Sequence, residues 1–137
     1  MDESITAHGH THVAATHEST LELTTDDYLT PAGDCIVGIE ADRAPSAFDR
    51  QFIEACQHVD ATIELELEAA GHRETVTGRG DPALTFDSGR SLVCRASEYI
   101  DERTVMVEAD TAAADLDRPL VEALAGGTVL RARLSVE

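Results

Sequence analysis

Two segments of the chain alternate strictly between apolar and polar residues, a pattern that predicts half-buried β-strands. They cover residues 61–69 and residues 129–136. Because successive side chains of a strand point to opposite faces, each segment offers one face to a core. The core-facing residues are Ile63, Leu65 and Leu67 in the first strand, and Leu130, Ala132, Leu134 and Val136 in the second.

The polar faces of these two strands carry opposite charges. The first strand presents Glu64, Glu66 and Glu68, and the second presents Arg131 and Arg133. If the strands were neighbours, each cross-strand pair would stabilise the sheet by about 0.2–1 kcal/mol. The alternative is that both rows are only solvated, and the sequence leaves both interpretations open.

Apolar residues at helical spacing predict a helix before each of these strands. The apolar stripe is Phe48, Phe52, Ile53, Cys56 and Val59 in the first helix, and Leu116, Leu120, Val121 and Leu124 in the second. Residues 46–49 have the form of a capping box that starts at Ser46, with Asp49 in the place of the usual glutamate. Proline is tolerated only in the first turn of a helix, so Pro119 requires the second helix to begin near Asp117.

The rest of the chain gives weaker signals. Residues 4–8 and 75–79 are predicted to be short extended pieces, and residues 13–23 one bent strand or two. Residues 25–29 look like a single helical turn, and residues 35–41 form an apolar run typical of a strand buried on both faces. The intervening helix favours parallel pairing of the strands on either side of it, while the early hairpin-like pieces favour antiparallel pairing.

The same order of elements occurs twice along the chain. A constant difference of 68 separates the pairs Val37/Val105, Glu40/Glu108, Ala41/Ala109, Asp42/Asp110, Asp49/Asp117, Arg50/Arg118 and Glu54/Glu122. Earlier pairs such as Tyr28 and Tyr99 differ by 71, so the first half holds three extra residues between Leu29 and Ile36. Self-similarity of this kind indicates a repeated structural unit.

We therefore predict an α+β fold with internally duplicated β-β-β-α-β units. A single domain over residues 1–137 would contain two tandem repeats, at about 3–69 and 74–137. A pseudo-two-fold axis would relate the repeats, and two helices would lie outside a mixed sheet. That sheet is either open or closed into a barrel-like form.

The charge of the chain restricts its partners. A net charge of −17 comes from acidic residues spread along the whole sequence, and all ten basic residues are arginine. Such a composition is typical of a surface adapted to high salt, where a carboxylate-rich surface keeps a protein soluble; an acidic surface with a binding role is the alternative. It argues against nucleic acid as the main partner, because phosphates are normally met by a basic patch.

Cysteine usage and the absence of targeting patterns bear on location. The three cysteines form no CxxC pair, which favours a reducing compartment. The acidic N-terminus has no signal-peptide pattern, and no apolar run is long enough to span a bilayer. We expect a cytoplasmic protein that does not enter a membrane.

Reactive side chains gather in the first repeat only. His8, His10, His12 and His17 correspond to Arg79, Asp81, Ala83 and Ser88 of the second repeat. In an extended segment, alternate histidines would lie about 6.6–6.8 Å apart on one face, a spacing that can hold a metal. We predict a divalent metal such as zinc at His8, His10, His17 and Cys35. The predicted ligand-binding residues are His10, His17, Asp34, Cys35 and Asp42.

Each of these residues also has a simpler interpretation. The histidines could form a solvated edge, in which His17 acts only as a hydrogen-bonding residue beside Thr20. Cys35 could pair with a histidine as nucleophile and base, or it could be a core residue that opens a strand. Asp42 and its counterpart Asp110 each end a strand, a place where aspartate commonly stabilises a turn.

Several short motifs of the first repeat resemble an archaeal family known as domain of unknown function 371. They are Gly9-His10, Val13, His17, Thr20, Glu22, Gly33-Asp34-Cys35-Ile36, Gly38 and Ala41-Asp42. The family pattern often has Asn at the position of His12 and Lys at that of Arg43. The resemblance covers nearly the full length and implies an archaeal, haloarchaeal, cytoplasmic protein with no assigned activity. Residues 28–37 also look like the Gly-Asp turn of double-psi and related barrels, which favours the barrel-like form.

Two functions fit these observations. The first is a small-molecule or metal-binding protein with its site in the N-terminal repeat, and the sequence leaves open whether it is an enzyme. The second is a protein or RNA interaction module without catalytic activity. In that case Arg79, Arg90, Arg95 and Arg103 would form a local basic patch.

Overall fold

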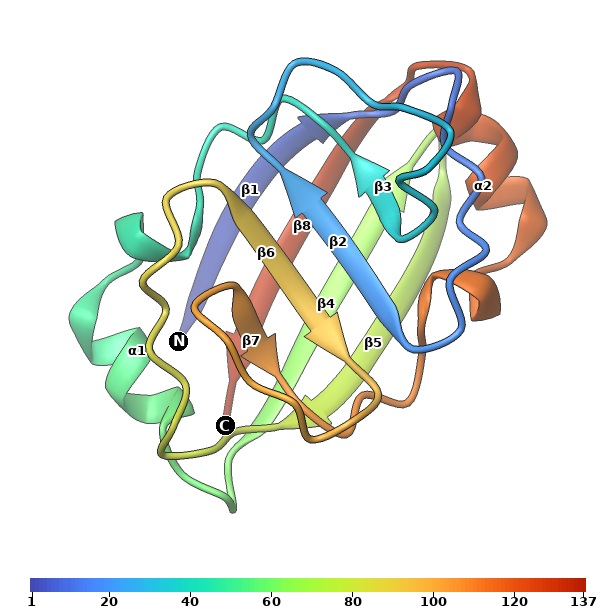
Figure 1. The fold of residues 1–137 in the computed structure, drawn as a ribbon. Coiled ribbons are helices and arrows are strands. Elements are labelled where there is room, and N and C mark those ends of the chain that lie inside the picture. The colour runs from blue at the N-terminus through green and yellow to red at the C-terminus, as the bar shows by residue number, and fades with distance from the viewer.

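The computed structural model describes all residues, 1–137, as two four-stranded sheets packed face to face (Figure 1). Sheet A has the strand order β1-β8-β4-β5 and is antiparallel throughout. Its strands are β1 Asp2–His8, β8 Val129–Val136, β4 Thr62–Ala69 and β5 His72–Arg79. The two strands predicted from alternation are β4 and β8, and they are neighbours.

Sheet B has the order β3-β2-β6-β7 and is mixed. Its strands are β2 Thr20–Thr24, β3 Ile36–Gly38, β6 Ser91–Arg95 and β7 Thr104–Met106. The central strands β2 and β6 are antiparallel, while β3 and β7 run parallel to their neighbours β2 and β6 at the edges. A mixed sheet was predicted, and sheet B has that form.

The core lies between the two sheets and continues under the helices. Ile63, Leu65 and Leu67 of β4 are completely buried, and the apolar residues of β8 join them in one cluster of 35 buried residues. The alternation of β4 and β8 therefore faces the way that the sequence predicts. The three phenylalanines pack against one another at ring-centroid distances of 5.9–6.3 Å.

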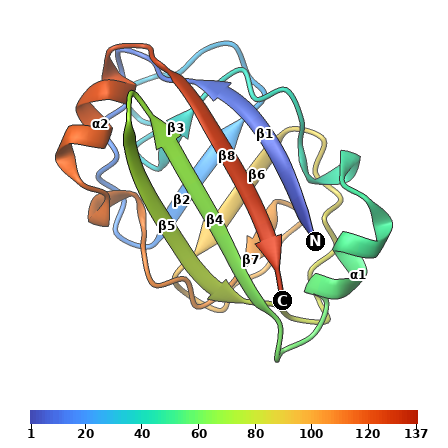
Figure 2. The same ribbon diagram turned by 180° about the vertical axis from the view of Figure 1, so that it is seen from behind.

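Two short helices lie at the side edges of sheet A, and neither covers its outer face (Figure 2). They are α1 Arg50–Cys56 and α2 Arg118–Ala125, each preceded by a 3-10 turn, η1 Pro45–Ala47 or η2 Ala113–Asp115. Pro119 lies in the first turn of α2, as predicted. The expected cap at Ser46 is wrong, because Ser46 lies within η1. Asp49 caps α1 instead, its carboxylate accepting a hydrogen bond from Gln51 N at 2.8 Å.

Three other expectations about local structure are corrected. Residues 25–29 form no helical turn, and only Thr20–Thr24 of the segment 13–23 is a strand. The strands on either side of α1, β3 and β4, belong to different sheets and do not pair in parallel. Strand β3 is only three residues long, and the chain leaves it through Glu40 at a positive φ of 54°. This turn directs the chain away from sheet B, so α1 connects the two sheets rather than two strands of one.

Neither sheet closes into a barrel, so the barrel-like form is not observed. The facing edges of the sheets are linked only by isolated bridges, one between His8 and Ile39 and one between Arg79 and Val107. A single bridge cannot continue a ladder, because the short strands β3 and β7 end just before it. The molecule is an α+β sandwich joined at two corners.

The strand registers match between the two halves of the chain. At the centre of sheet B, Glu22 lies opposite Val93, its counterpart at a difference of 71. At the centre of sheet A, Glu66 lies opposite Arg133, at a difference of 67. Each central pair of strands therefore joins one strand from each half in antiparallel orientation.

Candidate functional site

His10 stabilises a turn in the first half of the chain. Its Nδ1 accepts a hydrogen bond from His12 N at 3.0 Å. In the second half, the carboxylate of Asp81 accepts a hydrogen bond from Ala83 N at 2.9 Å, at the corresponding place. The two residue types differ, but both supply an acceptor to the amide two residues further on.

His17 has the same kind of role before β2. Its Nδ1 accepts hydrogen bonds from Ser19 N and Thr20 N, both at 3.1 Å, and lies 3.0 Å from the Thr20 hydroxyl. Ser88 does the same before β6, where its hydroxyl accepts from Arg90 N and Ser91 N at 3.1 Å. His17 thus makes the hydrogen bonds beside Thr20 that the simpler interpretation expects, and its role as a site residue stays a prediction. Its Nδ1 is engaged by these amides, which leaves Nε2 for any ligand.

Cys35 lies next to a mostly buried carboxylate. Its thiol donates to Glu22 Oε1 at 3.5 Å, and Arg103 Nη1 approaches the same oxygen at 3.9 Å. Burial, and then the negative charge of Glu22, raise the pKa of the Cys35 thiol to about 11. The thiol is therefore protonated at neutral pH, whereas a nucleophilic or metal-binding cysteine needs a thiolate. This environment disfavours Cys35 as an activated nucleophile.

The two predicted aspartates differ in their surroundings. The main-chain oxygen of Asp34 accepts hydrogen bonds from Thr16 N and His17 N at 3.0 and 3.2 Å, so the extra loop of the first half lies against His17. Asp42 instead contacts β1, where its carboxylate accepts a hydrogen bond from Thr6 N at 2.9 Å. Asp110 makes the same contact in the second half, also at 2.9 Å, which supports a structural role for both.

The structure thus brings His17, Asp34 and Cys35 together near the start of β2, with Glu22 among them. His8 lies at the end of β1 and pairs with Ile39, and His10 stays within its own turn. No group of three His, Cys, Asp or Glu side chains is arranged to hold a metal ion. The two hollows of the surface are lined by other residues. Metal or ligand binding in the first repeat stays a prediction.

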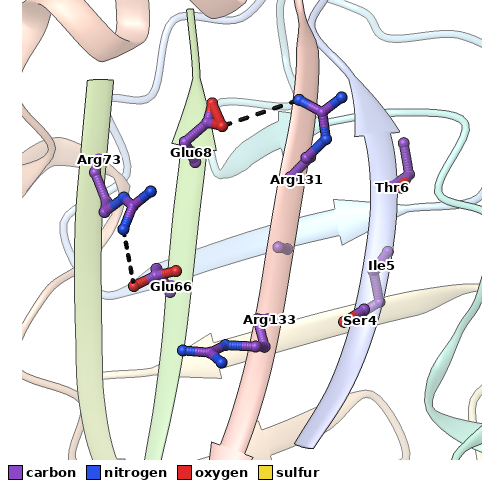
Figure 3. Close-up of a pocket in the computed structure, with 9 residues that line it drawn as sticks. Ser4, Ile5, Thr6, Glu66, Glu68, Arg73, Arg131 and Arg133 are labelled. Atoms are coloured by element: carbon purple, nitrogen blue, oxygen red, sulfur yellow. Dashed lines mark ion pairs between the residues drawn. The ribbon is translucent and has the colours of Figure 1, made fainter. Parts of the chain in front are cut away.

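The larger hollow lies on the outer side of sheet A. Its volume is about 470 Å³, and polar side chains from all four strands line it (Figure 3). We call this surface the arginine–glutamate face and define it by Ser4, Thr6, Glu64, Glu66, Glu68, Arg73, Arg131 and Arg133. Charge alternates from strand to strand, with arginine on β5, glutamate on β4 and arginine on β8.

The arginines of this face are loosely held. Arg73 lies 3.9 Å from Glu66, Arg131 lies 3.9 Å from Glu68, and Arg133 lies 3.7 Å from Asp2. None of the three guanidinium groups makes a hydrogen bond, and their side chains are 55–69% exposed. Pairs of this length and exposure contribute little to stability. Their donors are therefore free to bind a partner.

Other arginines are committed to contacts within the chain. Arg79 pairs with Glu108 at 2.6 Å, and Arg90 pairs with Asp26 at the same distance. Arg95 and Arg103 both bind Asp101, at 2.9 and 2.8 Å. The four arginines expected to form a basic patch are thus neutralised locally. Such a patch is not observed.

Sequence reasoning found Arg131 and Arg133 but missed Arg73. The signal was present in the connection between β4 and β5. Ala70 and Gly71 both have positive φ, 52° and 82°, and form a two-residue hairpin turn. Such a turn fixes the register and places Arg73 opposite Glu68. The Ala70-Gly71 pair lacks the Asn or Asp that usually marks this turn, which is why the pattern did not reveal it.

Comparisons with known proteins place the chain among relatives of unassigned function. The family model described as Domain of unknown function (DUF371) matches residues 5–137. An uncharacterized protein of the archaeon Methanocaldococcus jannaschii is 40% identical over 130 residues, which are 95% of this chain and 96% of that protein. No helix of the structure is both long enough and apolar enough to cross a membrane.

Proposed function

Since the chain belongs to the domain of unknown function 371 family, whose description assigns no activity, we propose its function from its surface: it is an interaction module that binds a protein partner. The binding surface is the arginine–glutamate face. One observation carries this proposal, namely that three arginines without hydrogen bonds lie on one face of one sheet. The unused hydrogen-bond donors of these guanidinium groups can bind acidic groups of a partner, at closer range than the acids 3.7–3.9 Å away within the chain.

The shape of the face favours a docking surface over a small-molecule pocket. Pockets for small molecules are concave and mostly apolar, with a few polar groups that fix orientation. Here only Ile5 and Ala132 of the nine lining residues are apolar, and the hollow opens broadly to solvent. A polar, shallow surface of this kind resembles the wet rim of a transient protein interface.

The charge pattern favours protein over nucleic acid as the partner. Glu64, Glu66 and Glu68 form a continuous acidic column between the arginines of β5 and β8. A phosphate backbone that reached Arg131 would lie against this column and against the negative charge of the whole chain. A protein surface can present carboxylates to the arginines and arginines or lysines to the glutamates at the same time.

A capture experiment with matched variants tests the proposal. R131Q and R50Q each remove one positive charge, and neither arginine makes a hydrogen bond within the chain. Each chain is immobilised and exposed to archaeal cell extract at several KCl concentrations, and recovered proteins are quantified by mass spectrometry. We expect at least one protein to be retained by wild type and R50Q and depleted with R131Q. If R131Q and R50Q recover every protein equally from an extract to which the soluble chain itself has been added, the face is not a docking surface.

We also infer that the fold arose by internal duplication, as one domain with repeats at about 3–69 and 74–137 about a pseudo-two-fold axis. Matching central registers in both sheets support this inference, as do the equivalent contacts of Asp42 and Asp110.

The acidic, lysine-free composition supports adaptation to high salt and a haloarchaeal origin. Unfolding free energies measured over a range of KCl concentrations test this second inference, with stability expected to rise with salt.

A further inference from the structure

Building on the proposed function, we propose that the partner of the arginine–glutamate face is a second copy of the same chain. Two copies would pack sheet A against sheet A, face to face. The occupant follows from the pattern of charges on the face, which is complementary to itself.

The complementarity follows from the register of β4 and β8. Glu66 lies directly opposite Arg133, and Glu68 lies directly opposite Arg131. Consider a two-fold axis that runs parallel to the strands, midway between β4 and β8, in the plane between two stacked sheets. It places β4 of each copy over β8 of the other and leaves positions along the strands unchanged. Glu66 and Glu68 of each copy then face Arg133 and Arg131 of the other, while Glu64 faces Ser135.

Both rows match at once because the two columns have the same repeat. Side chains on one face of a strand recur every two residues, about 6.6–6.8 Å apart, in β4 as in β8. Stacked sheets lie about 10 Å apart, a gap that arginine and glutamate side chains span together. Within one chain Arg131 lies 3.9 Å from Glu68 and Arg133 lies 3.7 Å from Asp2, so hydrogen bonds across the interface replace loose contacts rather than strong ones.

The size of the face predicts a weak, reversible dimer. Four strands of seven or eight residues cover roughly 500 Å² per copy, from the usual strand spacing and rise. Two such faces bury about 1,000 Å², at the lower end of specific interfaces. A homodimer needs no other partner, and an isologous interface of this kind is the commonest form of self-association.

Salt should strengthen this association rather than weaken it. Each copy carries a net charge of −17, so two copies repel one another at long range. The Debye length falls from about 10 Å at 0.1 M salt to about 3 Å at 1 M, which removes that repulsion. The pairs across the interface are in direct contact and partly buried, so they are screened much less.

Sedimentation velocity over a wide range of protein concentration tests the proposal, at 0.1 M and 1 M KCl. We expect wild type and R50Q to dimerise, more so at high salt, and R131E/R133E to remain monomeric. The variant E66R/E68R/R131E/R133E exchanges the two columns and keeps the net charge. We expect it to dimerise with itself but to mix with fluorescently labelled wild type at least about tenfold more weakly, because like charges then face one another. Circular dichroism confirms that each variant is folded.

The outcomes separate this inference from the proposed function. A wild-type chain that stays monomeric overturns the second copy as occupant. The docking role then still stands if R131Q loses a captured protein that R50Q retains, and it falls if no such protein exists. Dimerisation that survives in R131E/R133E, or free mixing of the exchanged variant with wild type, places the dimer contact on another surface and also overturns the inference.

Discussion

Asp101 holds together the most buried charged network of the molecule. Its carboxylate accepts hydrogen bonds from Arg95 at 2.9 Å and from Arg103 at 2.8 Å, and its side chain is 16% exposed. Burial alone would raise the pKa of this carboxyl. Hydrogen bonds from the side chain and main chain of Arg103, and from Arg95, outweigh burial and lower the pKa from 3.8 to about 2.

The substitution D101N removes this charge at nearly constant volume. The shift of the Asp101 pKa corresponds to about 2 kcal/mol of stability at neutral pH. Arg95 would also lose its carboxylate while only 9% exposed. Breaking a fully buried pair costs about 3–5 kcal/mol, and the partial exposure of Asp101 reduces that. We expect a total loss of about 2–3 kcal/mol in the free energy of unfolding at pH 7.

The pH dependence gives the sharper test. A carboxyl whose pKa is lowered by folding stabilises fully above its unfolded value of 3.8, and this contribution is lost as pH falls toward 2. The difference between wild type and D101N in urea-unfolding free energy should therefore shrink by about 2 kcal/mol between pH 5 and pH 2. D27N is the control, because Asp27 is exposed and its carboxylate makes no hydrogen bond or ion pair. If the difference between wild type and D101N does not change with pH, the network does not hold Asp101 ionised.

Three further predictions follow from other contacts. The unfolding free energy of H17S should lie within about 0.5 kcal/mol of wild type, because Ser88 accepts the same hydrogen bonds in the equivalent turn, whereas that of H17A should fall by about 1 kcal/mol. Equal losses for the two variants in urea unfolding would contradict the shared role. G9A should lower the melting temperature strongly, because an added Cβ would lie 1.9 Å from the carbonyl oxygen of Leu124, while G89A, with nothing nearer than 3.5 Å, should not; equal effects in calorimetry would refute that close approach. E22Q should speed alkylation of Cys35 by iodoacetamide at pH 8, because it removes a negative charge that raises the pKa of the thiol. C35A serves as the blank, and an unchanged alkylation rate would show that Glu22 does not act on the thiol.

Local patterns in the sequence determined the faces of the elements. The alternation in 61–69 and 129–136 fixed which side chains enter the core, because a strand has a period of two whatever it pairs with. Pro119 fixed the start of α2 because its ring excludes it from the interior of a helix. The constant differences between the halves predicted a repeated unit, and that duplication stays a prediction.

Tertiary structure decided which strands pair and which charged groups are free. The sheet to which β3 belongs could not be assigned from the sequence. Its three residues pair with β2, whereas the next strand along the chain, β4, pairs in the other sheet with β8, some seventy positions away. The one-sided histidines suggested a site, yet His17 and Ser88 accept equivalent amide hydrogen bonds, since a turn needs an acceptor and not a particular residue type. An arginine is free or bound according to the acid that folding brings beside it. That depends on contacts between distant segments, and so the arginine–glutamate face emerged only from the folded chain.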